Sequence, residues 1–587
     1  MTTVIGRRRH PSTEPGAGRY GGLRYGAGGD HGRNKTCLLW GTAIGSSRPD
    51  AVCGSRCPTS HGPRSTVGLA RPMQLKSSNP RRLDAPYGHP YHLLGFLLSY
   101  CAIMFAFALV ARGWGPLHAD MTEAWAWGKE FQLGYGKHPP IYAWIAGAWF
   151  QWMPRTNWSF HLLSILSAGI GLAGVWMLAG LWLGVLGRWA AVLFLLLTPS
   201  WTLWALKFNA NSILLCFWSW TAYFFLASLL TRGLAYAALA GVAGAMAMLS
   251  KYYSIILLAT LLVVAVLHPD RGRYFRSAAP YVTAAFGAAF IAAHVWWLVQ
   301  SDFPTFSYAL SKTQYPIAEA RASALKAVAV SYVCLGASFL AFVVAFGQQC
   351  RGLLATVARA TCRPQTAWLI WLAHGPLLLT AAAYLVTNVR ITAQHLIPAL
   401  FAMPVAFLSC SGADVSWRVV KRLAWCVAAV WGSMLVSSPL IASYTFAHAN
   451  SESVEPRQEI ALAITETWHR AFGQPLRYVA GTERLATAAT FYSPDAPSYL
   501  MLSNPALTPW VAVEPARRDG VCIICSLSDQ QCLTQARLLG GEASLHFSRQ
   551  FSARFLGRPA APQIFAFFLL APMKDDVTQP LQRAAGG

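Results

Sequence analysis

A succession of apolar segments between residues 92 and 446 constrains the fold of this chain more than any other feature. A helix needs about 20 apolar residues to cross the hydrocarbon core of a bilayer. The segments that approach or reach this length lie at 92–111, 161–184, 188–205, 211–230, 233–249, 252–267, 277–299, 324–347, 366–387, 392–410 and 423–446. Only 12% of the 587 residues are charged, whereas soluble proteins have about 25%. The sequence therefore predicts an α-helical polytopic membrane protein with about 11 spans and excludes a purely soluble enzyme.

The formal net charge of +24 is unevenly distributed. Residues 1–91 hold 14 Lys and Arg against four acidic residues, are rich in Gly, Pro and Ser, and lack a sustained apolar period. We predict a disordered basic tail of little functional weight. Met73, just before the first apolar segment, is an alternative start of translation. The remaining cations are spread through apolar sequence and form no basic face, so we expect no nucleic-acid partner.

Basic loops between the spans predict the orientation. With eleven spans and a cytoplasmic N-terminus, three basic loops fall on the cytoplasmic side, as the positive-inside rule requires. They contain Arg271, Arg273 and Arg276, then Arg351, Arg359 and Arg363, then Arg418, Lys421 and Arg422. A twelfth span at 140–152 would place these three basic loops on the exterior side instead. We therefore interpret that Trp-rich segment as a helix lying in the interface. The loop 112–160 and everything after residue 446 then face the periplasm of a bacterial inner membrane.

Residues 447–587 differ in pattern from the apolar region, 92–446. Helical patterns lie at 459–472 and 485–491, and strand patterns lie at 476–479, 521–524 and 564–570. This alternation predicts a small periplasmic α/β domain. Its cysteines, Cys522, Cys525 and Cys532, are an incomplete metal set. We expect one disulfide and one spare thiol, with the pairing open.

The first exterior loop carries a dense polar and aromatic motif. It reads His118-Ala-Asp120-Met-Thr-Glu123-Ala-Trp-Ala-Trp127-Gly-Lys129, then Gly134-Tyr135-Gly-Lys137-His138-Pro-Pro. Two carboxylates three residues apart share one face of a short helix. With a cation and a histidine at the membrane surface, they could deprotonate a hydroxyl and stabilise a phosphate leaving group. A solvated loop helix with ordinary charges is the structural alternative.

This loop resembles the first periplasmic loop of polyprenyl-phosphate-sugar-dependent glycosyltransferases with the GT-C fold. That broad family includes protein mannosyltransferases and lipid A aminoarabinose transferases, and the resemblance is greatest to rhizobial galacturonosyltransferases that decorate lipopolysaccharide. Supporting motifs are Phe208-Asn-Ala-Asn211, Ser250-Lys-Tyr-Tyr253 and Asp302-Phe-Pro-Thr-Phe306. The resemblance covers residues 92–410 well and the C-terminal domain more loosely.

The resemblance implies inverting transfer of a sugar from a polyprenyl phosphate to a cell-envelope glycolipid, such as lipid A or lipopolysaccharide core. It suggests galacturonic acid as the sugar. A carboxylate of the first loop would lie at the reacting centre, with Asp120 as base and Glu123 orienting the acceptor. The sequence departs from the family's common Asp-Glu-Ala pattern, because Thr122 precedes Glu123, so either carboxylate could be catalytic. No cofactor is implied, and a divalent cation at Asp120 is compatible but not required.

Further site residues are expected at the exterior ends of spans. Lys207, Lys251 and Arg390 lie where the positive-inside rule disfavours cations, and with Lys137 they are expected to bind the donor phosphate. Snorkelling to lipid headgroups is the structural alternative for the cations at span ends. Expected substrate-binding residues are Tyr135, His138, Asn209, Asn211 and Asp302.

Two other classes of protein fit the span count. A secondary transporter would place ionisable residues near the middle of the membrane, whereas the notable charges here gather at one face. A non-catalytic envelope assembly protein leaves the carboxylate loop unexplained. A protein hydroxyl is an alternative acceptor for the enzyme.

Deletion of residues 1–72 is expected to leave the activity of the protein unchanged, because the tail has no apolar pattern with which to pack. Product formation in membranes with matched protein levels measures this. A substantial loss would contradict the small role given to the tail.

Overall fold

The computed structural model describes residues 89–311, 315–361, 363–386, 392–448, 454–540 and 545–573. These residues belong to one compact unit, Gln74–Gly587. The predicted basic tail up to residue 88, with Met73, lies outside the described residues, and so does Arg390.

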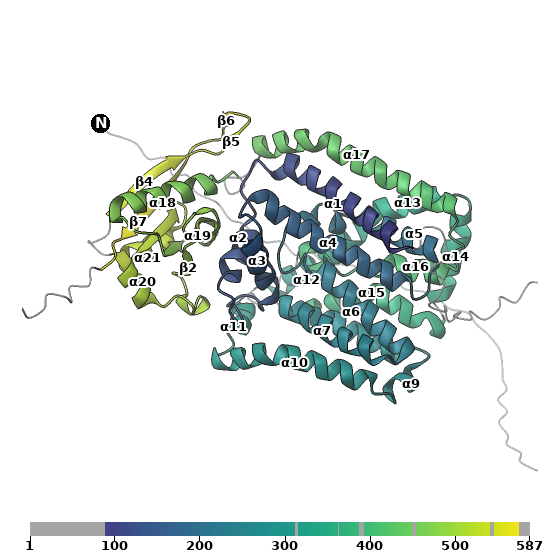
Figure 1. Ribbon diagram of the computed structural model, residues 1–587. Coiled ribbons are helices and arrows are strands. Elements are labelled where there is room, and N and C mark those ends of the chain that lie inside the picture. Colours follow the sequence, from purple (N-terminus) through teal and green to yellow (C-terminus); the bar gives the residue numbers. More distant parts are fainter. Residues whose placement is uncertain are drawn as a thin grey trace, which may run out of the picture. The chain divides into compact units, whose positions relative to one another are not determined.

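Seven helical segments of the described chain are long and apolar enough to cross a membrane. They are α1 (Pro90–Arg112), α4 (Asn157–Ala179), α6 (Leu214–Thr231), α10 (Ala279–Gln300), α12 (Ile317–Val333) with α13 (Gly336–Phe346), α15 (Ala367–Leu385) and α17 (Trp417–His448). The helices α4, α6, α7 (Leu234–Ser250) and α10 pack in that order across the apolar region (Figure 1). The predicted polytopic helical architecture is confirmed.

The other four predicted spans contain helices that are shorter or broken. Two are α7 (Leu234–Ser250) and α8 (Ile255–Leu267), with 17 and 13 residues. The segment 392–410 forms a turn, η5 (Ala393–Leu396), and then α16 (Met403–Ser411).

The fourth, 188–205, bends by 89° between α5 (Val185–Leu195) and the turns η1 (Pro199–Trp201) and η2 (Trp204–Leu206). Pro199 explains the break, because proline disfavours a helical residue before it, and Thr198 is extended. This bend places Lys207 and Asn209 directly after η2.

The first loop folds as two short helices, α2 (Ala119–Gly128) and α3 (Ile141–Trp152). They approach so closely that a Cβ atom on Gly128 would lie 2.0 Å from the Ala143 carbonyl oxygen. With 12 residues, α3 is too short to cross a bilayer. It buries Tyr142 and Phe150, while Trp152 is 88% exposed. This agrees with the interpretation of 140–152 as a non-spanning helix.

The C-terminal domain is a mixed five-stranded sheet with helices, in the strand order β2-β1-β3-β7-β4 (Figure 1). Its strands are β1 (Tyr478–Gly481), β2 (Ser498–Leu500), β3 (Val521–Ser526), β4 (Leu545–Phe551) and β7 (Gln563–Leu570). Its helices are α18 (Arg457–Phe472), α19 (Glu483–Tyr492), α20 (Val513–Asp519) and α21 (Gln530–Gly540). Strands β1, β2 and β3 are parallel, and β7 is antiparallel to its neighbours β3 and β4. The predicted α/β domain is confirmed, and β2, β4, α20 and α21 add to the predicted elements.

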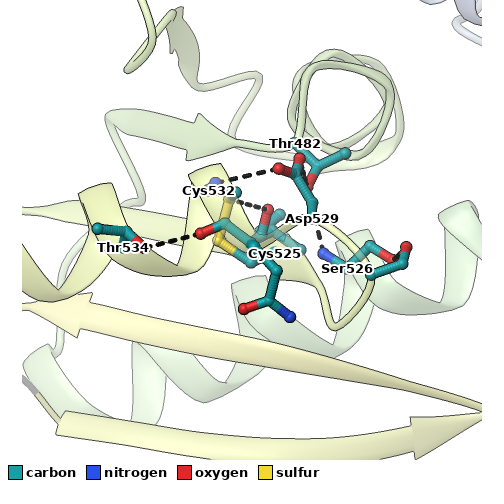
Figure 2. The surroundings of a disulfide bond; sticks show 9 residues. Thr482, Cys525, Ser526, Asp529, Cys532 and Thr534 are labelled. Carbon is teal, nitrogen blue, oxygen red and sulfur yellow. Dashed lines mark hydrogen bonds between the residues drawn. A yellow bond between two sulfur atoms is a disulfide. The ribbon is translucent and has the colours of Figure 1, made fainter.

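The expected disulfide joins Cys525 to Cys532 and leaves Cys522 as a buried free thiol on β3. It closes a short loop between β3 and α21 (Figure 2). The Asp529 carboxylate in this loop accepts hydrogen bonds from the Thr482 hydroxyl at 2.8 Å and the Cys532 backbone N–H at 3.0 Å.

The C-terminal domain contacts the first loop through α19, which packs against α2. The Thr122 and Thr487 hydroxyl oxygens are 3.1 Å apart. Arg155 donates to the carbonyl oxygens of Phe491 and Ser493 at 3.1 and 3.0 Å. The loop is therefore held from the side of the C-terminal domain as well as by the membrane helices.

A cysteine at Arg470 tests the predicted orientation, because this α18 side chain is 69% exposed. R470C is expected to react with a membrane-impermeant thiol reagent in intact spheroplasts. R273C, between α8 and α10 with a side chain 76% exposed, is the matched control and should react only after lysis. Protection of R470C, or labelling of R273C in intact spheroplasts, would contradict the orientation.

Candidate active site

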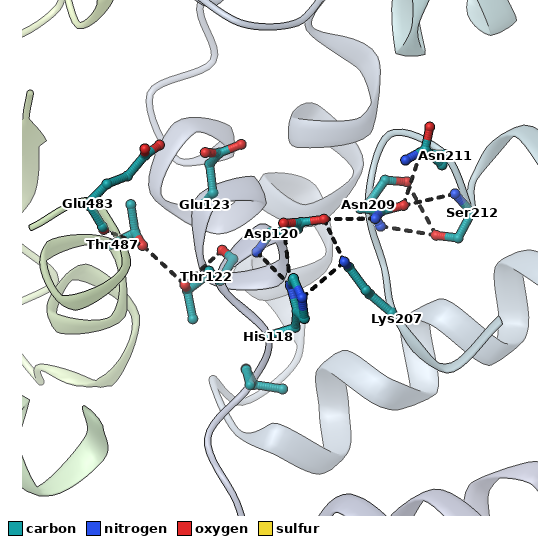
Figure 3. A network of polar contacts seen from close by, with 12 residues as sticks. His118, Asp120, Thr122, Glu123, Lys207, Asn209, Asn211, Ser212, Glu483 and Thr487 are labelled. Carbon is teal, nitrogen blue, oxygen red and sulfur yellow. Dashed lines mark hydrogen bonds and ion pairs between the residues drawn. The ribbon is translucent and has the colours of Figure 1, made fainter. Parts of the chain in front are cut away.

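Asp120 lies in the first turn of α2 and faces the segment that follows the broken span (Figure 3). His118 is the N-cap residue, and its Nδ1 accepts the Asp120 backbone N–H at 3.2 Å. The N-terminal end of a helix favours a negative charge. Local sequence thus places an anion where the helix stabilises it.

Three side chains contact the Asp120 carboxylate. Lys207 Nζ lies 2.8 Å from Oδ2, and Asn209 Nδ2 donates to the same oxygen at 2.9 Å. His118 Nδ1 lies 3.3 Å from Oδ1. Burial acts to raise the pKa of Asp120, but the contact with His118 and the Lys207 charge outweigh it and hold this pKa well below its usual range. Asp120 is therefore ionised and, while Lys207 is in contact, a weak base.

Lys251 is a second cation near Asp120, and its environment differs from that of Lys207. Its Nζ donates to the Asn211 amide oxygen at 2.5 Å. Burial lowers the pKa of Lys251 to about 8, with the attraction of Asp120 opposing and the repulsion of Lys207 adding to the shift. The ammonium is thus held by a neutral amide, and no carboxylate contacts it among the described residues.

His138 lies within electrostatic reach of Lys251, Lys137 and Asp120. Burial and the charges of the two lysines lower the pKa of His138 to about 3. Its ring packs edge-on against Tyr142 at 5.6 Å. His138 is therefore neutral at pH 7 and can exchange hydrogen bonds without adding charge.

Glu123, one helical turn after Asp120 on α2, belongs to a second cluster. Lys137 Nζ lies 2.8 Å from Glu123 Oε2 and also contacts Glu483 of α19. The side chains of Glu123, Lys137 and Glu483 are 14%, 14% and 39% exposed. Lys137 also lies over the Trp127 ring, 5.6 Å from its centroid. Lys137 is thus compensated by carboxylates, which favours Lys251 over Lys137 as a phosphate ligand.

Asn209, Tyr135 and Asp302, which were also predicted as substrate-binding residues, lie in three different environments. Asn209 Oδ1 accepts the backbone N–H groups of Asn211 and Ser212 at 3.0 and 2.9 Å, so Asn209 both shapes the turn and binds Asp120. Tyr135 is fully buried and stacks on Trp127 at 5.3 Å. Asp302 is exposed, has a positive φ of 55° and joins neither cluster. Asp302 is therefore the one described candidate that the fold leaves apart.

A cavity of about 460 Å³ adjoins the Asp120 cluster. His118, Lys207 and Asn209 line one side of it. Its other polar lining residues include Arg112, His161, Gln394, Arg457 and Arg484, and its aromatic ones are Trp114 and Trp204.

The sequence analysis did not identify the arginines of this cavity. Arg112 ends α1 beside the first loop, so the positive-inside rule applied to exterior cations could have found it. Arg457 and Arg484 come from the C-terminal domain and each bind Glu455 at 2.9 Å. No local pattern connects these two with the first loop.

Among the described residues, no group of three or more His, Cys, Asp or Glu side chains is arranged to hold a metal ion. Independence from a divalent cation stays a prediction.

Residues 137–297 match the family model described as dolichyl-phosphate-mannose-protein mannosyltransferase. The structure is similar to that of ArnT from Cupriavidus metallidurans in the apo state, with a TM-score of 0.53 and 14% identity over 81% of this chain and 98% of that chain. ArnT from Cupriavidus metallidurans bound to undecaprenyl phosphate gives a TM-score of 0.54 and 13% identity over 84% and 100%. No curated protein matches the sequence.

These likenesses define the architecture. The chain has the ArnT-like GT-C fold, and the expected resemblance to this class of membrane protein is confirmed. The narrower resemblance to galacturonosyltransferases stays a prediction.

Proposed function

We propose that this multi-pass membrane protein is a glycosyltransferase that moves a sugar from a polyprenyl phosphate to a cell-envelope glycolipid, with inversion, on the periplasmic face. The observation that carries the proposal is the Asp120 carboxylate paired with Lys207, with Lys251 within electrostatic reach, in the first loop of this fold. Galacturonic acid as the sugar, and lipid A or lipopolysaccharide core as the acceptor, rest on the motif resemblance.

Lys251 is the best-placed ligand for the donor phosphate. Its present partner is a neutral amide oxygen, and a phosphate oxygen would replace it with a charge-assisted hydrogen bond. The negative charge that develops on the phosphate leaving group is then stabilised by a cation already fixed in place. A protein of the same fold binds undecaprenyl phosphate, which supports a lipid phosphate as the ligand.

Lys207 couples phosphate binding to the basicity of Asp120. While Lys207 lies 2.8 Å from Asp120, the carboxylate has little tendency to take a proton. A donor phosphate that draws Lys207 away would raise the pKa of Asp120. The acceptor oxygen then attacks the anomeric carbon, the bond from this carbon to the phosphate oxygen breaks, and the acceptor proton passes to Asp120. For a phosphate acceptor, already ionised, Asp120 would only position the attacking oxygen.

The cavity supports an anionic, amphipathic acceptor. The Arg112 side chain makes no hydrogen bond or ion pair with any other residue in the described part of the chain, and it lines the cavity with Trp114 and Trp204. Arginine binds phosphate and carboxylate oxygens bidentately, while the indole rings suit the sugar and acyl boundary of a glycolipid. His118 and Lys207 bring this cavity into contact with the Asp120 cluster.

Substitution of the first-loop carboxylates tests the function. D120N is expected to lower transfer of labelled sugar from polyprenyl phosphate to envelope glycolipids by about a hundredfold or more. E123Q should also lower it, because Glu123 lies on the same helix. E130Q, which alters a carboxylate of the same loop outside both clusters, is the control for protein level. Wild-type activity in both D120N and E123Q would contradict the assignment of this loop.

The pH dependence of kcat/KM tests Lys251. With a pKa of about 8 in the free protein, the ammonium loses its proton above that pH, and kcat/KM should fall by about tenfold per pH unit. K251R keeps its charge and should move this fall to higher pH, whereas K251M should be weak throughout. An unchanged alkaline limb in an active K251R would contradict the assignment of this limb to Lys251.

A further inference from the structure

Lys137 contacts two glutamates, so the positive charge of one ammonium faces two carboxyl groups. Glu123 comes from α2, Lys137 from the loop before α3, and Glu483 from the first turn of α19 in the C-terminal domain. Figure 3 shows Glu123 and Glu483 on facing helices, with Thr122 and Thr487 in contact beside them. Two carboxylates thus share one ammonium in a largely buried place.

Among the described residues, no second cation contacts these two carboxylates. Tyr142 and Tyr499 are fully buried, within electrostatic reach of both carboxylates, and burial raises the pKa of each phenol well above its usual range. Tyr308 of α11 (Pro304–Ser311) also faces the cluster, as does Asp120 at longer range. Two like charges with a single counter-ion in such surroundings favour binding of a proton.

The two carboxylates differ in their surroundings, which determines where that proton resides. Burial raises the pKa of Glu123 well above its usual range, with Lys137 opposing and the Glu483 charge adding to the shift. For Glu483, burial is outweighed by the hydrogen bond from Glu123 and by the Lys137 charge, so its pKa is lowered. Glu123 is also the less exposed of the two.

Glu483 is held in place by the disulfide loop. The preceding residue, Thr482, donates its hydroxyl to Asp529 at 2.8 Å and accepts the Ser526 backbone N–H at 3.2 Å. Asp529 lies between Cys525 and Cys532, which the disulfide joins (Figure 2). The start of α19 is therefore fixed to the C-terminal end of β3 and is not free to turn away from Lys137.

We propose that Glu483 is a positioning residue of the active site: its carboxylate, held by the C-terminal domain, keeps Glu123 protonated and Lys137 in place beside it. Glu123 is then a neutral carboxyl group whose one proton is donated to Glu483, and the ionised carboxylate of α2 is Asp120 alone. The effect on transfer rests on the function proposed above, whereas the protonation does not.

Infrared difference spectra of the full-length protein without substrate test the protonation directly. The wild type minus E123Q should show a carboxylic-acid C=O stretching band at pH 7, where an ordinary glutamate, with a pKa of about 4.3, is ionised. E483Q should lose this band, because the remaining Glu123 and Lys137 then pair as ions. E483D, which keeps the carboxylate, should retain the band. E130Q is the control, because Glu130 accepts the Ser498 hydroxyl from the same domain at 2.8 Å but lies outside the cluster.

Two outcomes would overturn the proposal: no band in the wild type minus E123Q difference, or a band that persists in folded E483Q. The first comparison does not require E483Q to fold. In the transfer assay, E483Q should lower kcat/KM by about tenfold to a hundredfold, the size of one charge-assisted hydrogen bond. A band that behaves as expected in a protein without transferase activity would retain the proton assignment and reject the proposed function instead.

Discussion

The ion pair between Asp120 and Lys207 is the interaction on which the arrangement of the site depends. A partly buried carboxylate is costly unless it is paired and hydrogen-bonded. Its partner reaches it only because the span that begins with α5 breaks at Pro199 and turns by 89°. A continuous helix would carry Lys207 along the span axis, away from the first loop. The broken span and the N-terminus of α2 are thus two halves of one charge site.

The two carboxylates of α2 are stabilised in different ways. Asp120 is ionised, with donors from Lys207 and Asn209 and with the ring of His118 in contact. Among the described residues, Lys137 is the one cation that contacts Glu123, and Glu483 contacts the same ammonium. Environments that push the pKa values of two neighbouring carboxylates apart are typical of acid and base roles in one site. The assignment of Asp120 rather than Glu123 as the ionised group follows from these partners.

Much of the architecture could be predicted from sequence because it depends on local patterns. Apolar runs located a helix at every predicted span, and the period of the C-terminal residues located β1, β3 and β7. Lys207 and Asn209 contact Asp120, and Lys251 lies within its electrostatic reach, as the resemblance to one family led us to expect. The break at Pro199 was missed because the apolar run continues through it, although the proline itself was visible. Asp302 lies apart from the other candidates, since an aromatic exterior loop does not specify where it folds, and its expected role in substrate binding stays a prediction.

Glu483 could not have been predicted in this way, and the reason is physical. It lies 346 residues from Lys137, on a helix whose own pattern indicates only a buried face. Its role arises from the docking of α19 on α2, which is fixed by contacts such as Arg155 with the carbonyl oxygens of Phe491 and Ser493. Apolar helices in a bilayer cannot supply this many polar partners to a loop, because unpaired polar groups there are expensive. A domain outside the membrane can supply them, so the C-terminal domain belongs to the site as much as the spans do.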